Sequence, residues 1–171
     1  MSSFSVTNNH YLRVIYTGNT DVIKKADREN ASSSKLSQAD STALRKAIAR
    51  LADFDMDDVA DDDDTKKTTF YNNVKAFSDA YNYTLESGSD SQNASISKLT
   101  KQMKQLSEKY ADKMSDYGIT FDDKGYMSVK NSAINNISTS KYKELIGKDS
   151  DYAKELSSLA KKISRHIDIA V

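Results

Sequence analysis

The segment Tyr117–Val129 has the sequence YGITFDDKGYMSV, and within it the pattern changes from helical to strand periodicity. Apolar and polar residues alternate at Ile119–Phe121 and again at Met127–Val129, with the turn residues Asp122–Gly125 between them. This pattern predicts a small two-stranded β-hairpin over about residues 119–129. Because an isolated hairpin is only marginally stable in water, we expect it to pack on helices.

Two glycines mark the limits of this segment. Gly118 stands where a helix C-cap glycine belongs, and Gly125 stands in the turn between the two strands. Glycine adopts a positive φ at little cost, so the sequence predicts a left-handed backbone at the turn position.

Two amphipathic helices are predicted before the hairpin, over about residues 65–87 and 93–117. Their apolar residues recur at spacings of three and four, the seam spacing of a coiled coil. The second series drifts by one residue near Tyr110, as a local stutter would. Gly88 is expected to end the first helix, and the short loop after it predicts an antiparallel pair. The seam residues are Phe70, Val74, Phe77, Tyr81 and Leu85, then Ile96, Leu99, Met103, Leu106, Tyr110, Met114 and Tyr117.

Two outer helices are expected to complete the bundle. One begins near Ser37 or Gln38 and fades near Asp53, and the other begins after a cap at Asp149 or Ser150. We expect these two helices to pack together, which would bring the ends of the chain close to each other. Their apolar faces are Leu44, Ala47, Ile48 and Leu51 in the first, and Tyr152, Leu156, Leu159, Ile163 and Ile167 in the second.

The predicted fold is mainly α, an elongated antiparallel helical bundle or coiled coil with one small β-hairpin. A length of 171 residues is consistent with a single domain. Residues 1–37 are the least regular part and are expected to form an irregular N-terminal arm, ahead of a bundle domain over residues 38–171. Within that domain, residues 53–64 are dense in aspartate and predict a solvated acidic linker.

The composition argues against several classes of function. Lysine and arginine number 25, and aspartate and glutamate also number 25, so the clustered basic surface that binds nucleic acid is not expected. The chain has no cysteine, which excludes disulfides, thiol catalysis and thiolate metal sites. No run of about 18 apolar residues occurs, so no membrane span is expected. We expect no cofactor.

The acidic linker contains a weak calcium candidate. Asp53, Asp55 and Asp57 imitate the first half of a calcium-binding loop, in which alternate oxygens surround the cation. The sixth position holds Asp58 instead of glycine, and the twelfth holds Asp64 instead of the longer glutamate. A solvated linker is therefore the favoured interpretation, with Asp53, Asp55, Asp57 and Asp64 as the residues that would bind a cation.

The sequence gives little support for catalysis. His10 and His166 are the two histidines, and they lie in the irregular arm and near the end of the last helix. Neither a Gly-x-Ser-x-Gly nucleophile elbow nor a phosphate-binding Gly-Lys-Ser/Thr loop occurs in the chain. We therefore expect a protein that is not an enzyme.

Three motifs, in order, resemble a known family. The helix motif Phe-x-x-x-Tyr-Asn occurs as FSDAYN at residues 77–82, Gly-Ile follows at residues 118–119, and DKGYMSV follows at residues 123–129. Together they are similar to the C-terminal region of flagellar hook-associated protein 2, the filament cap, over about residues 70–167. The final helix around Leu156–Ile163 occupies the place of that family's closing coiled-coil helix.

The chain also departs from the family. Filament caps are generally much longer and carry inserted β-rich domains. In the hairpin, Met127 replaces the usual leucine, and Lys130 replaces the aspartate that follows. The resemblance therefore implies the family's helical fold more strongly than it implies capping.

The leading hypothesis is a structural or interaction protein, which the resemblance makes an axial flagellar component. It would assemble by packing its apolar seams against partner or sister helices. The alternative is a monomeric cytosolic adaptor or binding module whose seams are satisfied internally. The N-terminus lacks the features of a secretory signal peptide, so we expect a cytoplasmic protein or export by a flagellar-type route. The seam residues assigned to interaction are Phe77, Tyr81, Leu99, Met103, Leu106, Leu156 and Ile163.

Overall fold

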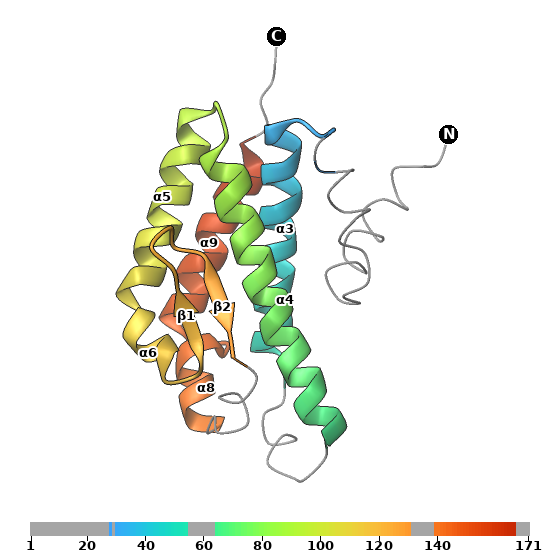
Figure 1. Ribbon diagram of the computed structural model, residues 1–171, viewed down its shortest axis with the longest axis vertical. Helices are drawn as coiled ribbons and strands as arrows, with labels where there is room; N and C mark the ends of the chain where they lie inside the picture. Colours follow the sequence, from blue (N-terminus) through green and yellow to red (C-terminus); the bar gives the residue numbers. More distant parts are fainter. Residues whose placement is uncertain (1–27, 29, 55–63, 131–138, 167–171) are drawn as a thin grey trace, which may run out of the picture.

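The computed structural model describes residues 28, 30–54, 64–130 and 139–166, and these residues form an antiparallel helical bundle (Figure 1). Contacts join each of the long helices to two others, so the bundle closes on itself: α3 packs on α4 and α9, and α5 packs on the same two. The predicted mainly α bundle is confirmed. Its long helices are α3 (Ser33–Ala52), α4 (Asp64–Ser89), α5 (Ala94–Lys109) and α9 (Asp151–Arg165).

The interior changes in character along the bundle. At one end, Phe70 packs against Phe54 and Tyr142, with ring centroids 5.4 and 5.1 Å apart. The short helix α8 (Thr139–Ile146) supports this end, where the Tyr142 hydroxyl donates a 2.6 Å hydrogen bond to the carbonyl of Leu51. At the other end, where α3 begins and α4 finishes, the buried side chains are small or polar: Ser37, Asp40, Ser41, Thr84 and Ser87.

Helix α3 begins at Ser33, four to five residues earlier than the sequence pattern predicted. Residues 33–37, which were predicted to belong to the irregular arm, are therefore part of the helix. The apolar face of α3 starts only at Ala43, and its first turns are held by buried polar residues that hydrophobic periodicity does not detect. Residues 1–27 and 29 of the predicted arm lie outside the described residues.

Gly88 does not end α4, which continues to Ser89. Its role is close packing, because a Cβ atom at Gly88 would collide with the side chain of Thr100 on α5. Glycine thus permits the last turn of α4 to approach α5.

The helix predicted over residues 93–117 is broken at Tyr110, where the sequence had indicated a stutter. Helix α5 ends at Lys109, and a short helix α6 (Ala111–Ser115) follows. At the break, the ring of Tyr110 lies 5.1 Å from the ring of Tyr152 on α9.

The predicted hairpin is confirmed. Strands β1 (Ile119–Phe121) and β2 (Met127–Val129) pair antiparallel, with Ile119 opposite Val129. Gly118 and Gly125 have φ values of 70° and 89°, the left-handed conformation expected for the turn glycine. The hairpin packs beside α4, on one face of the bundle (Figure 1).

The predicted cap and packing of the last helix are also confirmed. Ser150 caps the start of α9, where its Oγ accepts a 3.2 Å hydrogen bond from the amide of Ala153. Helix α9 packs on α3. Ile167, predicted to extend the α9 seam, lies outside the described residues. No helix within the described ranges is long and apolar enough to cross a membrane.

Candidate functional site: an arginine clasp at one end of the bundle

The seam residues assigned to interaction are mostly buried in the chain's own interior. Six of the seven are at most 7% exposed, and only Leu99 is half-buried. Because these six side chains contact the chain's own helices, a partner must contact a different surface. The six are Phe77, Tyr81, Met103, Leu106, Leu156 and Ile163.

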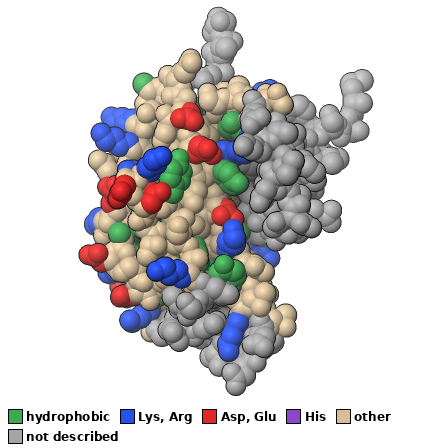
Figure 2. Space-filling model, viewed as in Figure 1, with side chains coloured by type: hydrophobic (Ala, Val, Ile, Leu, Met, Phe, Trp, Pro, Cys, Tyr) green, Lys and Arg blue, Asp and Glu red, His purple; other side chains and the backbone are tan. Residues whose placement is uncertain are grey.

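The outer surface offers polar groups instead. Figure 2 shows side chains of both charge signs interspersed over the face that carries α4 and the hairpin, with hydrophobic side chains in small separate spots. Such a face suits contacts made by charge and hydrogen bonding more than by a large apolar patch.

The calcium prediction finds no cluster in the described part of the chain. Asp53 is exposed just after α3 and forms an ion pair with Lys148, with 3.1 Å between Oδ1 and Nζ. Asp55, Asp57 and the side chain of Asp64 lie outside the described residues. Among the described residues, no group of three or more His, Asp or Glu side chains could hold a metal ion. The calcium site stays a prediction.

The structure describes one of the two histidines. His166 is exposed directly after α9, and His10 lies outside the described residues.

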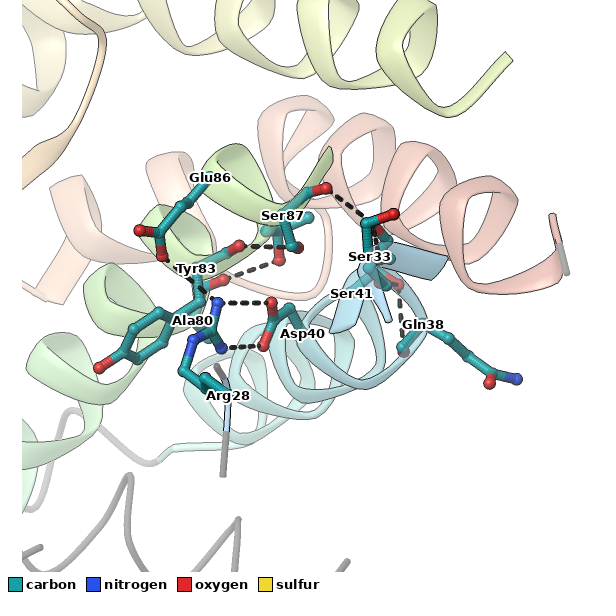
Figure 3. Close-up of polar contacts among 11 residues, drawn as sticks. Arg28, Ser33, Gln38, Asp40, Ser41, Ala80, Tyr83, Glu86 and Ser87 are labelled. Carbon is teal, nitrogen blue, oxygen red and sulfur yellow. Dashed lines mark hydrogen bonds and ion pairs between the residues drawn. The ribbon is translucent and has the colours of Figure 1, made fainter. Parts of the chain in front are cut away.

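The most developed polar cluster lies around Arg28, at the end of the bundle where α3 begins (Figure 3). The guanidinium donates from Nη1 and Nη2 to the two carboxylate oxygens of Asp40, at 2.9 and 3.2 Å. Nη2 also lies 3.3 Å from Oε2 of Glu86. The guanidinium carbon is 4.2 Å from the centroid of the Tyr83 ring. We call Asp40, Tyr83 and Glu86 the arginine clasp.

Two helices position the clasp. Asp40 comes from the polar first half of α3, while Tyr83 and Glu86 come from the last turns of α4. Residues three apart on a helix share a face, so Tyr83 and Glu86 both face the guanidinium. Arg28 itself precedes the first residue of α3, so its side chain joins the chain ahead of the bundle to both helices.

Buried serines hold these two helices in place beside the clasp. Ser37 Oγ lies 2.9 Å from the carbonyl oxygens of both Ser33 and Ser87, which ties the start of α3 to the end of α4. Ser87 Oγ in turn donates to the carbonyl of Tyr83 at 2.9 Å (Figure 3). The Ser37–Ser87 hydrogen bond therefore fixes the two helices that carry the clasp residues relative to each other.

The geometry is selective for a guanidinium group. A planar fork donates two parallel hydrogen bonds to one carboxylate, which an ammonium group cannot do, and it also stacks on an aromatic ring. The Asp40 side chain is 0% exposed and the Arg28 side chain is 14% exposed, so the pair is largely removed from water. Burying a carboxylate is costly unless it is paired, so the Arg28 cation helps to hold Asp40 inside the bundle.

Sequence reasoning missed the clasp. Arg28 lies in a segment without periodicity, and Asp40 is a polar residue one helical turn before Leu44, at a position where the apolar pattern has not yet begun. Glu86 lies 58 residues from Arg28, so no local spacing relates the two.

The Tyr-Asn motif of α4 holds the hairpin. Asn82 Nδ2 donates to the carbonyl of Met127 at 2.8 Å, and Asn82 Oδ1 accepts from the Met127 amide at 2.7 Å. Ser78 Oγ donates to the same carbonyl at 3.1 Å. In this way α4 satisfies the backbone of β2 at Met127.

Comparisons with models of known protein families, with curated proteins and with solved structures found no match. The resemblance to flagellar hook-associated protein 2 therefore stays a sequence-based prediction.

Proposed function

We propose that the chain is a non-enzymatic structural protein that works through protein–protein contacts, as the helical module of an axial flagellar component similar to the filament cap. The helix motif at residues 77–82 and the hairpin at residues 119–129 are the parts that carry the resemblance. The observation that carries the proposal is their direct coupling through Asn82 and Met127. A motif whose members form one packed unit supports a shared module better than motifs that lie apart.

The surface of the bundle supports contacts outside the apolar seams. Six of the seven seam residues are buried inside the chain and cannot contact another copy. Association of copies would therefore use exposed polar groups, such as those near the ends of the helices. This follows from the general rule that an interface needs accessible side chains with complementary charge and shape.

Because the seam residues are buried within the chain, a second candidate is also favoured. This candidate is a monomeric adaptor that binds another protein through the same polar surface. The two candidates differ in what the purified chain does alone. An axial component should associate with further copies or with filaments, whereas an adaptor should stay monomeric.

Sedimentation velocity from micromolar to millimolar concentration separates the two. We expect oligomers whose share rises with concentration, and we expect the protein to cosediment with purified flagellar filaments. A strict monomer that does not bind filaments would contradict the axial proposal and favour the adaptor. Leu99→Ser provides a matched control, because it changes the one half-buried seam residue and should leave association through polar groups intact.

A further inference from the structure

We propose that the outer surface between α5 and α9 binds an acidic amphipathic helix of another protein. We call this surface the α5–α9 strip and define it by two leucines along its centre and three cations at its edge: Leu99, Leu159, Lys98, Lys162 and Arg165. The inference goes beyond the proposed function, because it concerns a different partner and does not require copies of the chain to associate.

Leu99 and Leu159 lie at one level of the bundle. Helices α5 and α9 pack together and run in opposite directions (Figure 1), and the hydroxyls of Ser107 and Tyr152, 3.0 Å apart, fix their register. Leu99 comes eight residues before Ser107, and Leu159 comes seven residues after Tyr152. At about 1.5 Å per residue, the two leucines are therefore displaced by about 12 and 10 Å in the same direction along the bundle.

The two leucines also lie on the sides of their helices that face each other. Leu99 precedes Tyr110 by eleven residues, or about three turns, and the Tyr110 ring lies 5.1 Å from the Tyr152 ring. Leu159 follows Tyr152 by about two turns. Both leucines are only half-buried, so apolar surface between α5 and α9 is accessible to a partner.

Three cations border this apolar surface. Lys98 directly precedes Leu99, whereas Lys162 and Arg165 follow Leu159 by three and six residues. All three cationic residues are exposed, and no ion pair joins any of them to another described residue. The edge of the strip therefore carries positive charge that can pair with a partner.

The acidic residues of the two helices lie away from these cations. On α5, Glu108 lies about 15 Å along the helix from Lys98 and forms an ion pair with a lysine of the same helix. On α9, Glu155 lies about 10 Å before Lys162. The balanced charge of the whole chain hides this local surplus, because eight of its 25 aspartate and glutamate residues lie within residues 53–64.

The strip has the make-up of a protein-binding surface, since an apolar centre with a charged rim is the usual anatomy of a protein–protein interface. A helix that lies along α5 and α9 presents apolar side chains to the leucines at every third or fourth position, and carboxylates beside those positions meet the cations. The phosphate backbone of duplex DNA offers the leucines no apolar group, and three cations replace few of its counterions. The partner we infer is therefore an acidic amphipathic helix.

Fluorescence polarisation with a synthetic peptide tests the proposal on the full chain. The probe is a labelled helical peptide of about 20 residues, about 30 Å long, with leucines along one face and glutamates beside them. We expect wild type to bind it, and we expect Lys98→Glu with Lys162→Glu to bind it about tenfold more weakly or worse. Lys35→Glu with Lys46→Glu is the matched control, because it makes the same change of charge at two exposed lysines of α3 and should bind the peptide like wild type. Absence of binding to wild type, or equal losses in the two double variants, would overturn the proposal.

The apolar part of the contact is tested from both sides. A peptide with serines in place of its leucines should bind wild type about tenfold more weakly or worse, because only its carboxylates remain. Leu99→Ser with Leu159→Ser should weaken binding of the leucine peptide in the same way, once circular dichroism has shown that this variant is folded. If it is not folded, the serine peptide alone decides. A serine peptide that binds as tightly as the leucine peptide would overturn recognition of an amphipathic helix.

Two further measurements separate this inference from other readings. Labelled duplex DNA of about 20 base pairs should bind more weakly than the peptide at physiological salt, and tighter binding that is lost in Lys98→Glu with Lys162→Glu would overturn the proposal in favour of nucleic acid. Sedimentation of wild type separates the inference from the proposed function. A chain that forms oligomers but does not bind the peptide would overturn only the inference, and a monomeric chain that binds the peptide would contradict only the axial proposal.

Discussion

The hydroxyl groups of Tyr152 and Ser107 lie 3.0 Å apart inside the bundle and join α9 to α5 by a hydrogen bond that is shielded from water. The Tyr81 hydroxyl is equally buried, yet no hydrogen-bond partner for it occurs among the described residues. The Tyr152 hydroxyl is thus hydrogen-bonded, while the Tyr81 hydroxyl has no partner among the described residues, and the two are expected to respond differently to the same substitution.

Tyr152→Phe should destabilise the protein and Tyr81→Phe should not. Loss of a hydrogen bond that leaves a buried partner costs about 1–3 kcal/mol, whereas removal of an unpaired buried hydroxyl is neutral or stabilising. Urea unfolding of the two variants measures the difference directly. Equal losses in both would mean that the Tyr81 hydroxyl has a partner after all.

Stability should fall steeply above pH 10. Burial raises the pKa of Tyr81 to about 12 and also raises the pKa of Tyr142 and Tyr152, while tyrosines in the unfolded chain titrate near the ordinary value of 10. The unfolded chain therefore loses these protons first, and the stabilisation present below pH 10 disappears as pH rises through the folded-state values. Each such tyrosine contributes about 1.4 kcal/mol per pH unit in that window.

Tyr81→Phe tests this effect, because burial is the main cause of the raised pKa; Ser107 opposes it only in part, and no partner within hydrogen-bond distance of the Tyr81 hydroxyl occurs among the described residues. Urea unfolding at pH 9 and pH 11 should show a smaller loss of stability in Tyr81→Phe than in wild type, by about 1.4 kcal/mol in total, because only the pH unit above 10 contributes. Identical slopes would contradict the raised pKa.

Local patterns predicted the fold well where they depended on the backbone or on apolar periodicity. The hairpin, the turn at Gly125 and the α9 cap at Ser150 follow from residues adjacent in sequence. The first turns of α3 were missed because buried Ser37 and Asp40 interrupt the apolar pattern, and their partners come from another helix. Periodicity describes one helix at a time and carries no information about which polar side chains will meet.

The candidate site lay beyond sequence reasoning for the same reason. Asn82 was identified as part of a motif, but its bonds to Met127 span 45 residues. Only the packed hairpin and helix bring the two together. The arginine clasp needs three segments in register, which a single sequence does not specify.

Asn82→Asp should loosen the hairpin. The flanking ladder bonds, from the Asp122 amide to the Tyr126 carbonyl and from the Lys130 amide to the Gly118 carbonyl, leave the amide and carbonyl of Met127 pointing away from β1, towards α4. Aspartate keeps an acceptor for the amide but replaces the donor to the carbonyl by a negative oxygen.

We expect Asn82→Asp to lower the free energy of unfolding by about 1–3 kcal/mol and to speed hydrogen exchange at Met127. Asn72→Asp is the matched control, because it makes the same change at an exposed position of α4 and should alter stability much less. Equal rates of hydrogen exchange at the Met127 amide in both variants would contradict the role of Asn82 in holding the hairpin on α4.

Gly88→Ala should destabilise the protein even though alanine is the better helix former. Alanine gains about 1 kcal/mol in helix propensity over glycine. Its Cβ would meet the side chain of Thr100, whose hydroxyl is held by a 3.0 Å hydrogen bond to the carbonyl of Ile96. Overpacking of this kind costs about 1–3 kcal/mol.

The double variant Gly88→Ala with Thr100→Ala removes the obstructing atoms and should recover much of that loss. Thermal or urea unfolding of the two single variants and the double variant gives the coupling between the positions. Additive losses would show that the two residues do not meet across α4 and α5.

Arg28→Ala should cost far more stability than removal of an exposed lysine. Deleting one partner of a buried ion pair costs about 3–5 kcal/mol, because the remaining charge stays buried, and the Asp40 side chain is 0% exposed. Lys75 and Asp79 form an exposed pair on α4, with 2.9 Å between Nζ and Oδ2, and Lys75→Ala should cost less than about 1 kcal/mol. Arg28→Lys should fall between them, since lysine restores the charge but not the fork. Urea unfolding of the three variants at equal ionic strength tests this order, and a loss in Arg28→Ala no larger than in Lys75→Ala would contradict a buried clasp.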